Sequence, residues 1–155
     1  MVVQKLFGTV TGKRLAILGF AFKADTNDTR EAPAIRICGD LLDEGAQLAI
    51  HDPKVEPAQM ARDLKQEAAA AADALSGTGS WALAESVEEA VSGADAVLIL
   101  TEWNDYRQLN WAELAARMRK PAWLFDARAV ADPEAVRTAG LTLSLIHISE
   151  PTRPI

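Results

Sequence analysis

The sequence is poor in cysteine and histidine and has no long apolar run. Its 155 residues include one cysteine, Cys38, which excludes an intramolecular disulfide and fits a reducing compartment. The two histidines, His51 and His147, are too few and too scattered for a zinc site, so no metal is expected. No apolar run approaches the roughly 18 residues of a membrane span, and the N-terminus lacks the order of a secretory signal. We therefore expect a cytoplasmic protein with no membrane partner.

Basic residues are also scarce relative to acidic ones. The chain has 16 Lys and Arg against 22 Asp and Glu, for a net charge of −6. A nucleic-acid surface needs clustered Lys and Arg, so we expect no nucleic-acid partner. A small anionic ligand stays open, because two or three well-placed cations are enough to bind it.

Short apolar runs alternate with helix-prone segments along the chain. The pattern predicts strands over residues 14–19, 47–51, 81–83, 94–100 and 122–125. It predicts helices from about Pro33 to Gly45 and over residues 57–75, 86–92, 111–118 and 133–139. This alternation predicts an α/β fold, with a Rossmann-like, doubly wound, mostly parallel sheet of about five strands and helices on both faces.

Ligands of open α/β sheets bind beyond the carboxyl ends of the strands. The first predicted strand ends at Gly19, and the loop after it carries Phe22, Lys23 and Arg30. No G-x-G-x-x-G turn and no P-loop follows any predicted strand, so the usual glycine-rich NAD-binding motif is absent from the sequence. An aromatic ring can stack on a base or sugar, and cations can neutralise a pyrophosphate. From the residues alone we favour a solvated loop whose charges pair locally.

Two further residues follow predicted strands and have two interpretations each. Arg128 could be a third cation for a phosphate, or it could form an ion pair with Asp126 or Asp132. Asp52 stands where a Rossmann domain carries its ribose-binding acid. Because the glycine turn is absent, we favour Asp52 as a turn residue that leads into Pro53.

Cys38 is a candidate nucleophile only by residue type. It shares a predicted helix face with the apolar residues Ile35 and Leu42, and no histidine is near it in the sequence. Reactive thiols occupy exposed, electropositive sites, so the pattern favours a buried structural cysteine.

Several blocks of the sequence match one family in order. They are residues 19–31, 43–46, 51–55, 93–97, 101–103, 120–122 and 125–128. In these blocks the sequence resembles the UDP-glucose 6-dehydrogenases of the UDP-glucose/GDP-mannose dehydrogenase family, over their C-terminal UDP-binding domain. Two departures follow the last predicted strand, because Ala127 replaces a usual glycine and Ala129 a second arginine.

The resemblance implies an NAD-dependent enzyme that oxidises UDP-glucose twice, with water, to UDP-glucuronate and two NADH. It implies that Phe22, Lys23 and Arg128 bind the UDP-sugar substrate and that Arg30 reaches toward NAD. Family members bind NAD mainly through an N-terminal domain and carry their catalytic cysteine upstream of this domain, so no catalytic residue is expected here. They are homo-oligomers at full length. The 155-residue chain alone is expected to bind UDP-sugar weakly and not to turn it over.

Two alternatives stay open. One is a stand-alone, non-enzymatic nucleotide-binding module. The other is a domain of a related dehydrogenase acting on UDP-N-acetylmannosamine or GDP-mannose. A coding region upstream of Met1 with G-x-G-x-x-G and a cysteine motif would favour an enzyme, whereas a promoter directly before Met1 would favour the module.

The last residues do not resemble the family. Residues 143–155 instead resemble a translation of a common transposase sequencing adaptor. We therefore expect residues 1–142 to form the UDP-binding domain and residues 143–155 to be a foreign tail, which removes His147 from any argument about chemistry. Resequencing the locus tests this expectation, and genomic DNA that encodes the tail would refute it.

Overall fold

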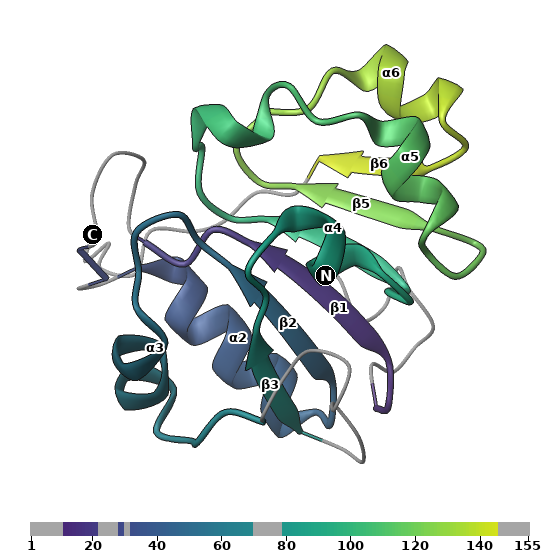
Figure 1. Cartoon of the computed structure of the whole chain (residues 1–155). Helices are drawn as coiled ribbons and strands as arrows, with labels where there is room; N and C mark the ends of the chain where they lie inside the picture. The colour runs from purple at the N-terminus through teal and green to yellow at the C-terminus, as the bar shows by residue number, and fades with distance from the viewer. Residues whose placement is uncertain (1–10, 22–27, 30–31, 70–78, 146–155) are drawn as a thin grey trace, which may run out of the picture.

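A computed structural model describes residues 11–21, 28–29, 32–69 and 79–145 of the chain. Six strands form one parallel sheet in the order β3-β2-β1-β4-β5-β6 (Figure 1). Their bounds are β1 Arg14–Leu18, β2 Gln47–His51, β3 Ser80–Leu83, β4 Ala96–Ile99, β5 Trp123–Asp126 and β6 Thr142–Leu145. The order reverses between β1 and β4, which is the switch point where ligands of such sheets bind. The predicted Rossmann-like, doubly wound sheet is confirmed.

Helices cover both faces of the sheet, as predicted. They are α2 Pro33–Asp43, α3 Pro57–Leu64, α4 Val87–Val91, α5 Trp111–Ala116 and α6 Pro133–Thr138, with a 3-10 turn, η2, over Asn104–Tyr106. Helix α2 packs against β2 and α3, whereas α4 packs on β1 and β2 and contacts α5, which contacts α6. Figure 1 shows α4 in front of the sheet and α2 behind it.

The sequence explains these elements locally. All four residues of β4 are buried, as strands covered on both faces require. Ser86 caps α4 by accepting a hydrogen bond from the Glu89 N–H, and Asn110 caps α5 in the same way through the Glu113 N–H. Proline in the first turn begins α2, α3 and α6, where its missing N–H costs nothing.

The helix predicted over residues 57–75 is shorter than its alanine content suggests. It ends at Leu64, and Lys65 adopts a left-handed conformation with φ of 58°. The chain then runs beside β3, where the Trp81 indole donates to the Gln66 carbonyl at 2.9 Å and the Ala69 N–H donates to the Trp81 carbonyl at 2.7 Å. The contacts that cover the edge strand β3 and satisfy the buried Trp81 outweigh the helix propensity of this segment. Residues 70–75 of the predicted helix lie outside the described part of the chain.

Strand β6 gives the sheet six strands rather than the about five predicted. It pairs with β5 from Thr142↔Trp123 to Leu145↔Asp126, and so it crosses the expected boundary at residue 142. Residues 146–155 lie outside the described residues. The boundary and the origin of the tail therefore stay predictions.

Gly19, directly after β1, has no room for a side chain. Its φ is +98°, and an added Cβ would lie 2.4 Å from the Thr101 Cβ and 2.7 Å from the Thr101 backbone nitrogen. Gly19→Ala combines this collision with left-handed strain, so we expect the free energy of unfolding to fall by about 2–5 kcal/mol. Urea denaturation of the purified chain measures the change.

Gly39 provides the matched control, because an added Cβ there meets no atom within 4 Å. Gly39 lies inside α2, where alanine is the better helix former, so Gly39→Ala should stabilise the chain by up to about 1 kcal/mol. Equal effects of the two substitutions would contradict the close approach at Gly19.

Candidate functional site

The loops that follow β1, β4 and β5 lie side by side at the carboxyl edge of the sheet. Backbone hydrogen bonds continue the ladder past the strands, from the Leu100 N–H to the Leu18 carbonyl at 2.9 Å and from the Ala127 N–H to the Ile99 carbonyl at 3.0 Å. The Thr101 hydroxyl, which is fully buried, donates to the Ala21 carbonyl at 2.8 Å. The three loops therefore form one connected surface at the switch point.

Asp126, at the end of β5, shapes the loop that carries Arg128. Its carboxylate is 1% exposed and accepts hydrogen bonds from the backbone N–H groups of Arg128, Val130 and Ala131 at 2.8–3.0 Å. Between these residues Ala129 adopts a positive φ of 54°, so the chain turns sharply. The buried carboxylate therefore holds the backbone on both sides of Ala129.

The Arg128 side chain lies across the gap between the loops after β5 and β4. Its Nε donates to the Leu100 carbonyl at 3.1 Å and lies 4.0 Å from Oε1 of Glu102. Among the described residues no ion pair joins it to Asp126 or Asp132, so the ion-pair interpretation of Arg128 does not hold there. Its terminal nitrogens have no hydrogen-bond partner in the same part of the chain, and the side chain is 29% exposed. The guanidinium is anchored at one end and available to an anion at the other.

Asp52, at the end of β2, is a structural residue. It is 8% exposed. Its two oxygens accept five hydrogen bonds at 2.7–3.2 Å, from the backbone N–H of Phe20, Ala21, Lys54 and Val55 and from the indole N–H of Trp103. The bonds to Lys54 and Val55 form the predicted turn into Pro53. The other three bonds join β2 to the loops after β1 and β4.

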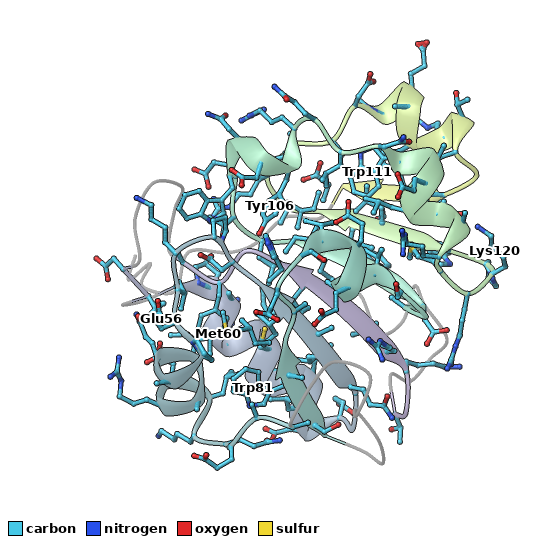
Figure 2. The ribbon with its side chains drawn as sticks, in the orientation of Figure 1. Glu56, Met60, Trp81, Tyr106, Trp111 and Lys120 are labelled. Carbon is cyan, nitrogen blue, oxygen red and sulfur yellow. The ribbon has the colours of Figure 1, made fainter. Side chains whose placement is uncertain are left out.

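Tyr106, labelled in Figure 2, forms a second link between the segment after β4 and β2 through His51. The Tyr106 hydroxyl lies 2.9 Å from Nδ1 of His51 and 3.1 Å from its carbonyl oxygen, and donates to the latter. Burial raises the pKa of Tyr106 well above its usual value, and the negative charge of Asp52 adds to this rise. Burial lowers the pKa of His51, although the charge of Asp52 opposes this fall. Both groups are therefore neutral at neutral pH, and η2 is held over the end of β2.

Phe22, Lys23 and Arg30 lie outside the described residues, so their predicted roles are not tested by the structure. Thr29 is described and is 5% exposed. Its hydroxyl donates to Oδ2 of Asp63 at 2.6 Å and accepts from Nε2 of Gln59 at 2.9 Å. These bonds attach the chain to α3 one residue before Arg30.

Cys38 is fully buried on α2, as predicted, and burial raises the pKa of its thiol. A thiol in this environment is held in its unreactive protonated form. Its place in the core under α2 also keeps it away from the loops at the carboxyl edge. Cys38 is therefore a structural residue.

The comparisons with known proteins agree with the blocks of matching sequence. The UDP binding domain of the UDP-glucose/GDP-mannose dehydrogenase family matches residues 16–133. The chain belongs to this family. The match begins inside β1 and contains β2 to β5 together with Asp52, Glu102 and Arg128, so the site at the switch point lies within the family domain.

Curated relatives share the same domain within longer chains. The UDP-glucose 6-dehydrogenase 2 of Oryza sativa subsp. japonica is 42% identical over 153 residues, which cover 92% of this chain and 31% of the relative. The UDP-glucose 6-dehydrogenase of Rattus norvegicus is 45% identical over 131 residues, which cover 84% of this chain and 26% of the relative. The chain thus spans less than a third of the length of these relatives.

Solved structures of similar proteins confirm the fold. A UDP-D-ManNAc dehydrogenase from Pyrococcus horikoshii is 25% identical with a TM-score of 0.61, covering 84% of this chain and 25% of that one. A UDP-glucose dehydrogenase from the archaeon Pyrobaculum islandicum is 22% identical with a TM-score of 0.66, covering 92% of this chain and 27% of that one. No helix within the described residues is long and apolar enough to cross a membrane.

Proposed function

We propose that this chain is the UDP-sugar-binding domain of a cytoplasmic, homo-oligomeric UDP-glucose 6-dehydrogenase. The observation that carries the proposal is Arg128, which is anchored through Nε, is 29% exposed and has terminal nitrogens without a partner among the described residues, at the switch point of a family UDP binding domain. Planar arginine binds a diphosphate through two parallel hydrogen bonds, which suits a nucleotide-sugar. The names of the relatives at 42–45% identity support UDP-glucose as substrate and UDP-glucuronate as product.

In this proposal three side chains bind the UDP-sugar. Arg128 binds the phosphates, Phe22 stacks on an apolar face of the ligand, and Lys23 adds a second positive charge. Arg30 reaches from the same loop toward NAD.

The described residues do not fit NAD at the turn after β1. A dinucleotide turn offers free backbone N–H groups to the pyrophosphate. Here the N–H groups of Phe20 and Ala21 donate to Oδ2 of Asp52 at 2.7 and 3.0 Å, so they are already used. We therefore assign NAD binding and the two oxidations of the reaction to a different domain of a full-length enzyme.

A titration of the purified 155-residue chain with UDP and UDP-glucose tests this function. We expect saturable binding with a Kd on the order of 0.1–1 mM, because one domain supplies only part of the contacts. We expect no NADH when NAD and UDP-glucose are added together. Isothermal calorimetry and NADH absorbance measure the two results, and either missing UDP binding or NADH formation would contradict the proposal.

The same titration compares the alternatives. UDP-N-acetylmannosamine and GDP-mannose replace UDP-glucose as ligands, because a structure at 25% identity is of a UDP-D-ManNAc dehydrogenase. Tighter binding of either ligand than of UDP-glucose would favour the related dehydrogenase. The stand-alone module would be favoured by UDP binding with no dehydrogenase domain encoded upstream of Met1.

A further inference from the structure

Glu102 is the acidic neighbour of Arg128, and its carboxylate has unused hydrogen-bonding capacity. Oε1 is buried and has no hydrogen-bond partner among the described residues. The contact to Nε of Arg128 is 4.0 Å, which is too long for a hydrogen bond. The side chain as a whole is 37% exposed, so part of it is open to a ligand beside the arginine although Oε1 itself is buried.

The backbone on both sides of Glu102 is fixed. Thr101 before it is fully buried and bonded to the Ala21 carbonyl, and Trp103 after it is 4% exposed and bonded to Asp52. Glu102 therefore projects from a rigid loop at a set place beside the guanidinium. Such preorganisation is typical of residues that contact a ligand, since little entropy is lost when the contact forms.

A carboxylate beside an anion-binding arginine has two opposite effects on a ligand. It repels a bare phosphate, because like charges at short distance disfavour one another. It also accepts hydrogen bonds strongly, and an ionised carboxylate has room for several donors. In a ligand that carries a phosphate and a neighbouring hydroxyl, the phosphate would bind Arg128 and the hydroxyl would donate a hydrogen bond to Glu102.

We propose that Glu102 selects phosphorylated ribose over bare phosphate by accepting a hydrogen bond from a ribose hydroxyl of the ligand bound at Arg128. The inference rests on the proposed function and adds a specificity-determining residue to it. The carboxylate of Asp52 cannot take this role, because it already accepts five hydrogen bonds from the protein. In the proposal Glu102 is instead the acidic acceptor beside the phosphates of the ligand.

The experiment compares three probes on the full 155-residue chain and on Glu102→Ala. The probes are UDP, 2′,3′-dideoxy-UDP and inorganic pyrophosphate. The unsubstituted chain should bind UDP about tenfold tighter than its dideoxy analogue, as expected for a hydrogen bond to a partly exposed charge. In Glu102→Ala the two nucleotides should bind with affinities within about twofold of each other. Pyrophosphate should bind to this variant about threefold tighter than to the unsubstituted chain, because the repelling carboxylate is gone.

Glu113→Ala is the matched control, because Glu113 forms an exposed pair with Arg117 on α5 at 3.2 Å and lies outside the loops after β4 and β5. It should leave all three affinities unchanged. Tighter pyrophosphate binding by Glu102→Ala also shows that the variant is folded and that Arg128 is in place.

The results distinguish the selectivity assigned to Glu102 from UDP binding by the chain. An unchanged preference for UDP over dideoxy-UDP in Glu102→Ala overturns the selection by Glu102 while UDP binding itself stands. A parallel loss of all three ligands means that Glu102 only supports Arg128, and it overturns the inference as well. Missing UDP binding by the unsubstituted chain overturns both the inference and the proposed function.

Discussion

Arg128→Ala should weaken UDP binding to the chain by about 10- to 100-fold, the range expected when hydrogen bonds to a charged group are lost. Among the described residues the guanidinium hydrogen-bonds only through Nε, to the Leu100 carbonyl at 3.1 Å, so its terminal nitrogens are available to the diphosphate. At 29% exposure the side chain contributes little to the core, and the fold should be retained. Isothermal calorimetry with UDP measures the loss, and circular dichroism checks the fold.

Two further variants show whether the loss is specific. Arg128→Lys keeps the charge but lacks the planar fork, so we expect an intermediate affinity. Arg117→Ala removes an arginine of comparable exposure, 43%, whose carbonyl accepts from Gly93 at the opposite edge of the sheet. It should leave UDP affinity unchanged. Equal losses in Arg117→Ala and Arg128→Ala would mean that only net charge matters.

Most of the fold could be predicted because its signals are local. Apolar runs that end at glycine or aspartate mark buried parallel strands, and Ser86 and Asn110 mark helix starts through side-chain caps. Two features could not be predicted from local signals. The helix after Pro57 ends early because the following segment covers β3 and satisfies Trp81, and β6 extends to Leu145 because β5 offers it a free edge. Both depend on neighbours distant in the sequence.

The candidate site was only partly predictable for the same reason. The strand-end rule selects Arg128, and the turn at Asp52 follows from Asp-Pro. Glu102 and Tyr106 also follow a predicted strand, but nothing local singles them out, since their importance depends on Arg128 and His51, respectively. Position after a strand could have drawn attention to Glu102, which lies in the same type of loop as Arg128. The partners that define its environment come from three different strand ends.

Substitution of Asp52 should lower the stability of the chain strongly. Asp52→Ala leaves four backbone N–H groups and the Trp103 indole without their acceptor. Because these donors lie at a carboxylate only 8% exposed, we expect the free energy of unfolding to fall by about 3–5 kcal/mol. Urea denaturation followed by tryptophan fluorescence measures the change, and Trp103 should report it directly.

Asp52→Asn and Asp40→Ala complete the comparison. The asparagine keeps one acceptor oxygen but directs an amide NH2 at the other donors, so its loss should be somewhat smaller than that of alanine. Asp40 is exposed on α2 and its substitution should change stability by no more than about 0.5 kcal/mol. If Asp52 were instead a ribose-binding acid, Asp52→Ala would keep normal stability and lose UDP affinity. The five hydrogen bonds to its carboxylate argue for the opposite result, because an acceptor already filled by the protein has no capacity left for a ligand.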